Sequence, residues 1–175
     1  MQIPPTVELT IQIREILLKK LLCVEPEEGC ALLLGNKAIN CEKLNLPEVI
    51  KIELIWPCSN EWEQMSSVFE QNYKRDEDRP TEKTSKKNRF AISPIDQIKA
   101  QKWARKRNLS VIGTAHSHPN GLAIPSTTDK IYNLNEDLML IVGIKNEIRA
   151  WQIQNDSQKK PVELKLLSNI KTSYV

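Results

Sequence analysis

Long hydrophobic runs and closely paired cysteines are both missing from this chain of 175 residues. No stretch of about 18 consecutive apolar residues occurs, so we expect no transmembrane helix. The N-terminal residues MQIPPTVELTIQIREI lack the basic start, apolar run and cleavage site of a secretory signal. The four cysteines show no C-x-x-C spacing, which argues against the all-cysteine zinc patterns. We therefore expect a cytoplasmic protein whose cysteines are isolated, buried thiols.

Aromatic residues and net charge are also low. Aromatics make up 5% of the chain and the formal net charge is +3. Basic and aromatic residues do not interleave as they do in a groove for single-stranded nucleic acid, so we expect no nucleic-acid partner. The length suits one domain with its own core. A content of 40% hydrophobic and 27% charged residues is typical of soluble globular proteins.

The apolar pattern predicts helices mixed with hairpin-linked strands. This mixture favours an α/β sheet with helices packed against it over a purely parallel arrangement. In the helix over 94–107, we expect Ile95, Ile98 and Trp103 to form much of the buried stripe. The expected elements are a helix over 7–22, strands over 30–35 and 49–56 (ended by Pro57), the helix over 94–107, strands over 109–115, 138–144 and 148–153, and an edge strand over 162–166.

Residues 61–88 differ from the rest of the chain in composition. They are rich in charged and small polar residues, and Pro80 lies within them. This pattern predicts a long polar insertion with a short helix around Met65–Tyr73. Two interpretations are open: a solvated loop without a role, and a flap over a substrate tail.

The two histidines of the chain are His116 and His118. Residues i and i+2 of a strand face the same side, so the two imidazoles converge while Ser117 points away. Asp129 can supply a third, oxygen ligand from the first turn of a helix, and Ser126 lies on the same side of that turn. Three protein ligands would leave a fourth zinc position for water, as in catalytic sites. Taken alone, Ser126 and Asp129 also fit a simple helix cap.

The pattern His116-x-His118-x7-Ser126-x-x-Asp129 resembles the signature of the JAMM (MPN+/Mov34/PAD-1) zinc metallopeptidases, in particular the small prokaryotic type. That family also requires an upstream glutamate before a short apolar strand.

The segment 28–35, Glu-Gly-Cys-Ala-Leu-Leu-Leu-Gly, resembles the part of the family that carries the glutamate, with Ala31 where small bacterial members usually have glycine. The register selects Glu28, and Glu25 and Glu27 are less favoured alternatives. Asn60 and the pair Arg89-Phe90 also fall in the family's order.

The resemblance implies a fold, a cofactor and a reaction. The fold would be a single MPN (JAB1-like) domain over residues 1–175, with a mixed β-sheet curved between helices in a cytidine-deaminase-like architecture. His116, His118 and Asp129 would bind Zn²⁺. Glu28 would take a proton from the attacking water and pass it to the leaving amine, while Ser126 would hydrogen-bond the oxyanion.

The resemblance also implies a substrate: an amide or isopeptide bond that follows the C-terminal tail of a ubiquitin-like or sulfur-carrier protein ending in Gly-Gly. We expect a monomer or weak homodimer. Two alternatives remain, a metal-free MPN scaffold and a relative of the RadC-type proteins. The first usually loses ligands that this chain keeps, and the second is disfavoured by the modest charge and the lack of a helix-hairpin-helix region.

Overall fold

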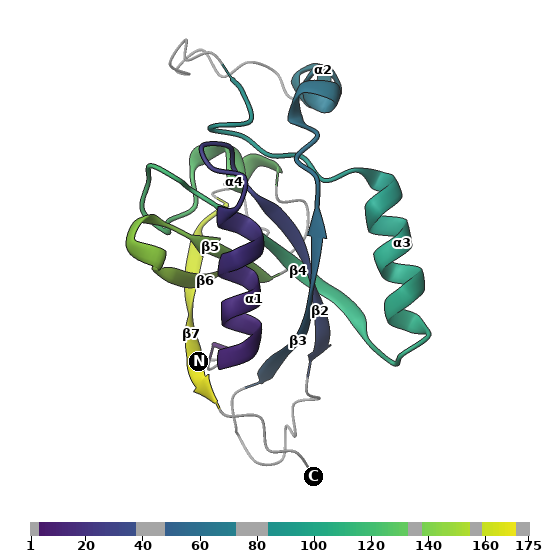
Figure 1. Ribbon diagram of the computed structural model, residues 1–175, viewed down its shortest axis with the longest axis vertical. Helices are drawn as coiled ribbons and strands as arrows, with labels where there is room; N and C mark the ends of the chain where they lie inside the picture. Colours follow the sequence, from purple (N-terminus) through teal and green to yellow (C-terminus); the bar gives the residue numbers. More distant parts are fainter. Residues whose placement is uncertain (1–3, 38–47, 73–83, 133–137, 155–158, 171–175) are drawn as a thin grey trace.

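The computed structural model describes residues 4–37, 48–72, 84–132, 138–154 and 159–170. Within these residues the strands form one closed barrel in the order β1-β3-β2-β4-β5-β6-β7, with β7 returning to pair with β1 (Figure 1). The elements are β1 (Thr6–Thr10), α1 (Ile11–Leu22), β2 (Cys30–Lys37), β3 (Val49–Cys58), α2 (Trp62–Asn72), α3 (Pro94–Arg105), β4 (Ser110–Ser117), α4 (Thr127–Tyr132), β5 (Leu138–Val142), the 3₁₀ turn η2 (Ile144–Asn146), β6 (Ile148–Ile153) and β7 (Pro161–Ile170).

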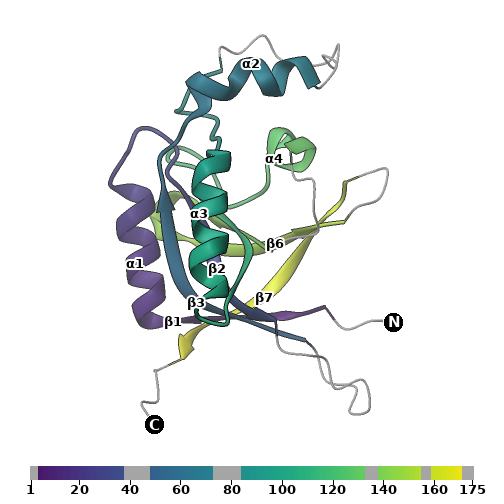
Figure 2. The same ribbon diagram turned by 90° about the vertical axis from the view of Figure 1, so that its right-hand side faces the viewer.

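The sheet is mixed, which confirms the predicted α/β class. β1 runs parallel to β3 and β7, and β4 runs parallel to β5, while the other neighbouring pairs are antiparallel. β2 and β4 are neighbours in this barrel, and α1 and α3 lie on opposite sides of them, as Figures 1 and 2 show. The start of β2 and the end of β4 pair with each other and lie between the layers formed by α1 and α3, where polar side chains can be buried.

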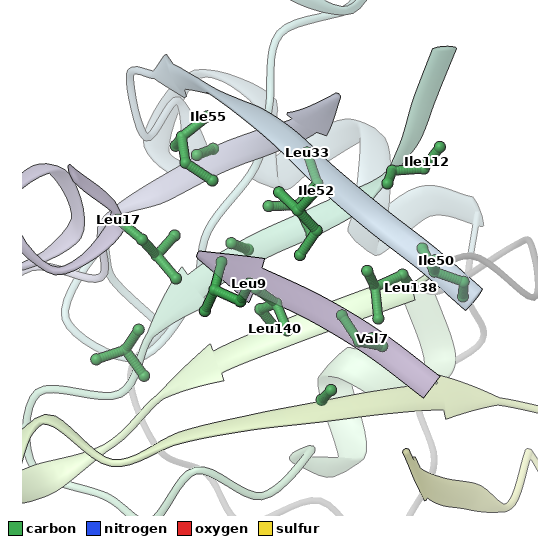
Figure 3. Close-up of a cluster of buried hydrophobic side chains, with 14 of the residues drawn as sticks. Val7, Leu9, Leu17, Leu33, Ile50, Ile52, Ile55, Ile112, Leu138 and Leu140 are labelled. Atoms are coloured by element: carbon green, nitrogen blue, oxygen red, sulfur yellow. The ribbon is translucent and has the colours of Figure 1, made fainter. Parts of the chain in front are cut away.

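Two apolar clusters meet across β2 because alternate side chains of a strand face opposite ways. Ala31 and Leu33 join the larger cluster, in which α1 contributes Leu17 and Leu21 (Figure 3). Leu32 and Leu34 join a second cluster beneath α3. β2 is therefore buried on both faces, as its continuous apolar sequence predicts.

The N-terminal end of the predicted first helix is wrong. Residues 6–10 form β1, and the helix begins at Ile11. Val7 and Leu9 are fully buried and their neighbours are half-buried, so burial alternates with the period of two that is typical of a strand. In the sequence, the helical spacing of the apolar residues that follow hides this short alternation. The Thr10 side chain accepts a hydrogen bond from the Ile13 amide and caps the helix, which marks the change from strand to helix.

Four strands extend beyond their predicted ends, namely β2, β3, β4 and β7. β3 continues through Pro57 to Cys58. Since β1 pairs with β3 only as far as Ile52, the later residues of β3 have one side without a partner strand in the described chain. Proline is tolerated at such an edge. β7 is not an edge strand, since it pairs with both β6 and β1 and closes the barrel.

The predicted buried stripe of α3 is wrong for two of its three residues. Ile95 is 63% exposed and Ile98 is 51% exposed, while Ala100 and Ala104 are fully buried. Trp103 does pack inward, in edge contact with Trp56. Small side chains let the helix lie close to the sheet, and a reading based on large apolar residues gives alanine too little weight.

The thiol prediction holds only in part. Cys30 is buried and Cys58 is half-buried, and burial raises the pKa of the Cys58 thiol to about 11. Cys23 is exposed, at the end of α1 where the core no longer covers the chain. Cys41 lies outside the described residues.

The polar insertion contains more helix than predicted. α2 begins at Trp62, three residues before the expected start, and Trp62 is buried. Tyr73 and Pro80 lie outside the described residues. None of the described helices is long and apolar enough to span a membrane.

Candidate metal centre

Three potential metal ligands converge where β4 ends and α4 begins. The Nε2 atoms of His116 and His118 lie 3.0 Å apart, and each lies 3.5 Å from a carboxylate oxygen of Asp129. One ligand atom from each residue falls within 4.8 Å of the others. The predicted convergence of the two imidazoles is thus confirmed, and α4 brings the carboxylate to them.

The backbone holds both histidines firmly. His116 is fully buried on a strand that pairs with β2 on one side and β5 on the other. His118 follows the end of β4, but its amide donates to the Val142 carbonyl at 2.8 Å and continues the ladder. Both rings therefore start from fixed backbone, which favours a preorganised site.

The ring orientation of His118 leaves one nitrogen available to a cation. Its Nδ1 lies 3.0 Å from the Leu122 carbonyl oxygen, which can only accept a hydrogen bond. Nδ1 therefore carries a proton, and Nε2 is directed at His116 and Asp129. This arrangement is typical of metal-binding histidines, whose second nitrogen usually donates to an oxygen.

Asp129 is held as a carboxylate. Burial alone would raise its pKa, but the charge and hydrogen bonds of His116, His118 and Ser126 hold the pKa well below its usual range. The Ser126 amide donates to Asp129 Oδ2 at 2.7 Å, and the Asp129 amide donates to Ser126 Oγ at 3.2 Å. This reciprocal pair is a helix cap, so the capping reading of Ser126 and Asp129 is correct, and it orients the carboxylate towards the histidines.

The donor set fits a zinc ion. His116 Nε2, His118 Nε2 and the Asp129 carboxylate converge on one point, where the histidines hydrogen-bond the carboxylate. Nδ1 of His116 is buried without a hydrogen-bond partner in the described chain, so a proton on either nitrogen leaves the ring imperfectly satisfied. A cation at the centre would take the place of the protons that these groups share, and two imidazoles with one carboxylate form a common three-ligand zinc site.

Glu28 is the buried member of the three candidate glutamates. It is 6% exposed, whereas Glu27 is half-buried and Glu25 is exposed. Burial raises the pKa of its carboxyl, and the charges of His116 and His118 oppose that rise. The structure thus brings Glu28 into electrostatic reach of the histidines.

Ser117 fixes the position of Glu28 relative to the histidines. It points away from them, as predicted, and its Oγ accepts a hydrogen bond from the Gly29 amide at 2.9 Å. In return, the Ser117 amide donates to the Gly29 carbonyl at 3.0 Å. A Cβ at position 29 would lie 2.2 Å from the Leu21 carbonyl oxygen, so glycine allows α1 and β2 to meet here. The residue after Glu28 is therefore locked to the residue between the two histidines.

Asn60 is a second support that spacing alone does not reveal. Its side-chain amide hydrogen-bonds backbone groups of several segments around the site, and both its nitrogen and its oxygen have partners. The nitrogen donates to the carbonyls of Glu28 (3.0 Å), Arg89 (2.9 Å) and Lys86 (3.4 Å), and the oxygen accepts from the amides of Trp62 (3.1 Å) and Ala91 (3.3 Å).

Phe90 covers the face of one candidate ligand. Its ring stacks on the His116 ring with centroids 4.4 Å apart and planes inclined by 23°. The segment that carries Phe90 is tied to Glu28 through the hydrogen bond from the Glu28 amide to the Lys86 carbonyl, at 2.7 Å. In the sequence, Asn60 and Phe90 stand out only through their order relative to the JAMM pattern, because neither has a distinctive local spacing.

Residues 10–154 match the model of the prokaryotic homologues of the JAB domain. The chain belongs to this family. The expected membership of the small prokaryotic JAMM/MPN group is therefore confirmed, together with the α/β fold that accompanies it. No curated protein matches the chain.

Solved structures agree with this fold over nearly the whole chain. A protein from Desulfitobacterium hafniense, solved in solution, is 22% identical, with 95% of this chain and 94% of that chain covered and a TM-score of 0.70. A second solution structure, from Salinibacter ruber, is 20% identical, with 95% of each chain covered and a TM-score of 0.59. The described fold is thus shared by distant bacterial proteins.

Proposed function

We propose that this protein is a zinc-dependent metallopeptidase or isopeptidase. It would hydrolyse the amide bond that follows the C-terminal tail of a ubiquitin-like or sulfur-carrier protein. The observation that supports the proposal most strongly is the convergence of His116, His118 and Asp129, with the buried carboxyl of Glu28 within electrostatic reach of them. A structural zinc site would need no such acid, and it would normally use a fourth protein ligand.

The residues around the ligands fit the separate steps of hydrolysis. Zinc, when bound, lowers the pKa of a coordinated water towards about 7 and polarises a carbonyl. Glu28 takes the proton of the attacking water and transfers it to the departing amine, for which a raised carboxyl pKa is suited. Phe90 shields His116 from solvent.

Ser126 would stabilise the oxyanion. Its Oγ already accepts the Asp129 amide, so its own hydrogen is free to donate elsewhere. Donation of this hydrogen to the developing oxyanion would stabilise charge that appears only in the transition state.

The substrate class rests on the resemblance of segments 28–35 and 116–129 to the JAMM family, whose members hydrolyse bonds that follow the C-terminal tails of ubiquitin-like and sulfur-carrier proteins. A metal-free scaffold would have no reason to keep an oriented carboxylate, a His118 ring fixed by the Leu122 carbonyl, and a buried glutamate together. Location in the cytoplasm and a monomeric or weakly dimeric state remain predictions from the sequence.

A cleavage assay on one defined substrate tests the proposal. A small sulfur-carrier protein ending in Gly-Gly is extended by a short C-terminal peptide and incubated with zinc-loaded protein. We expect release of the peptide, loss of the activity on chelation, and loss of activity with retained zinc in Glu28→Gln.

Glu27→Gln is the matched control, because it removes the neighbouring carboxyl and should leave cleavage unchanged. Cleavage that persists in Glu28→Gln would refute the assignment of the base. An absence of cleavage by well-folded, zinc-loaded wild-type protein on any such tail would favour the scaffold.

A further inference from the structure

The two candidate histidine ligands differ in what orients their rings. His118 Nδ1 lies 3.0 Å from the Leu122 carbonyl oxygen, and this hydrogen bond holds the ring in one plane. His116 Nδ1 is buried and has no hydrogen-bond partner in the described chain. A metal-binding histidine is usually oriented by a hydrogen bond at its second nitrogen, so the ring of His116 needs support of another kind.

The plane of an imidazole is not set by the backbone alone. The torsion that turns the ring about its bond to Cβ has a broad preference, unlike the staggered torsions of aliphatic side chains. The lone pair of a ring nitrogen lies in the plane of the ring, so a bound metal ion must lie in that plane too. A histidine whose ring can turn is therefore a weaker ligand than one whose ring is held.

Phe90 restricts the plane of the His116 ring. The two rings are stacked, with centroids 4.4 Å apart and planes inclined by 23°. Turning the imidazole out of this plane would push its ring atoms against the phenyl ring. A turn of 180° would preserve the stack, but the contacts of His116 Nε2 select one of these two orientations. That nitrogen lies 3.0 Å from His118 Nε2 and 3.5 Å from Asp129 Oδ1.

The backbone on both sides of Phe90 is held by one side chain. Asn60 Nδ2 donates to the Arg89 carbonyl at 2.9 Å, and Asn60 Oδ1 accepts from the Ala91 amide at 3.3 Å. The phenyl ring therefore starts from fixed backbone and can act as a rigid support.

The same segment is hydrogen-bonded to the candidate base. The Glu28 amide donates to the Lys86 carbonyl at 2.7 Å, and the Glu28 carbonyl accepts from Asn60 Nδ2 at 3.0 Å. The segment 86–91 thus contacts the ring of a candidate ligand through Phe90 and the backbone of the base through Lys86.

We propose that Phe90 is a positioning residue of the metal centre, whose ring holds the plane of the His116 imidazole in place of a hydrogen bond at Nδ1. This inference rests on the proposed hydrolase function and deepens it. The stack requires a flat side chain at position 90. An aliphatic side chain would fill the space and leave the imidazole able to turn.

Core packing alone does not require a flat ring. Phe90 also packs against the apolar cluster beneath α3, a contact that a large aliphatic side chain can make as well. The stack with His116 is the contact for which the shape of the ring matters. The two roles can therefore be separated by substitution.

Zinc affinity of two variants separates the roles. Phe90→Leu keeps an apolar side chain against the cluster but has no flat face, whereas Phe90→Tyr keeps the ring. Competition with a chromophoric chelator gives the Kd for zinc, and circular dichroism checks the fold. We expect zinc to bind about tenfold more weakly to Phe90→Leu, the lower end of the effect of removing a support from a metal-binding histidine. Phe90→Tyr should bind zinc as tightly as the wild type.

Cobalt(II) in place of zinc gives a second readout that needs no substrate. Its visible absorption depends on the geometry of the ligands around the metal. We expect the spectrum of the cobalt-loaded wild type to be reproduced by Phe90→Tyr and altered in Phe90→Leu.

Leu54→Ala is the matched control, because Leu54 is a half-buried residue that packs against the same cluster. It pairs with Leu34, whereas the β2 residue that pairs with His116 is Cys30, near the start of the strand. This variant should lower the Tm of the zinc-free protein and keep the zinc affinity and the cobalt spectrum of the wild type.

Equal zinc affinity and equal cobalt spectra of the wild type and Phe90→Leu would overturn the inference and leave the hydrolase proposal intact. Equal losses of affinity in Phe90→Leu and Leu54→Ala, or in Phe90→Leu and Phe90→Tyr, would overturn it as well, because the flat ring would not be the cause. If affinity falls in Phe90→Leu alone but the wild type cleaves no extended Gly-Gly tail, the inference stands and the hydrolase proposal fails. A wild type that binds no zinc would overturn both.

Discussion

Replacement of Ser117 by alanine is expected to destabilise the fold and to impair Glu28 without removing a ligand. The Ser117 side chain is completely buried. Its Oγ accepts from the Gly29 amide at 2.9 Å and donates to the Leu21 carbonyl at 3.4 Å, which joins the start of β2 to the last turn of α1. Alanine fits the same space but can make neither bond.

The magnitude follows from the groups left without partners. A buried amide that loses its acceptor costs about 1–3 kcal/mol, and the longer bond to the helix carbonyl adds a smaller amount. We therefore expect Ser117→Ala to lower the free energy of unfolding by about 3 kcal/mol. In a chain of this length, each kcal/mol corresponds to a fall in Tm of about 2–4 °C, which gives a fall of about 6–12 °C.

Urea unfolding followed by tryptophan fluorescence measures this change, with zinc removed so that metal binding does not mask it. Ser110→Ala is the matched control, because Ser110 lies on the same strand but is exposed. In the zinc-loaded protein, we also expect cleavage to fall by about tenfold or more, since small displacements of catalytic groups are costly. A stability within about 0.5 kcal/mol of wild type would refute the role assigned to the Ser117 hydrogen bonds.

Three further predictions follow from other residues. Asn60→Ala should lower the free energy of unfolding by about 2–4 kcal/mol and reduce cleavage, because several buried backbone groups lose their partner; a change below about 0.5 kcal/mol in urea unfolding would contradict this. In zinc-free protein, Glu28→Gln should raise Tm at pH 7 but not at pH 4. Because the pKa of Glu28 is higher in the folded protein than in the unfolded chain, ionisation of its carboxyl lowers the free energy of unfolding at pH values above the folded-state pKa. Below the unfolded-state pKa of about 4.3, the carboxyl is protonated in both states and its ionisation has no cost. An equal effect of the substitution at both pH values would show that ionisation is not the cause. Ile98→Gln should change stability by less than about 0.5 kcal/mol, whereas Ala104→Leu should cost about 1–3 kcal/mol in the same assay, and the reverse order would mean that α3 packs through its isoleucines.

The central strands could be predicted from the sequence because their signal is strong. A continuous apolar run such as 30–35 is favourable only where both faces are buried, and the structure buries β2 in this way. The convergence of His116 and His118 follows from the period of two in a strand. The capping role of Ser126 likewise follows from a three-residue spacing.

The errors have physical causes of their own. Barrel closure by β7 depends on pairing with β1, far away in the chain, and no local pattern in 161–170 reports that partner. The inward face of α3 depends on Ala100 and Ala104, whose small size allows close packing but contributes little to an apolar count. The contacts of Asn60 and Ser117 are hydrogen bonds between distant segments, so they appear only once the chain has folded.

Zinc stoichiometry tests the central claim most directly. Elemental analysis of protein purified without chelator should give about one zinc per chain for the wild type and for Glu28→Gln, with a clear loss in His118→Ala at unchanged fold. A wild-type protein that folds normally yet binds no zinc on addition of the metal, or a His118→Ala variant with undiminished zinc content, would contradict the assignment of His116, His118 and Asp129 as the metal centre.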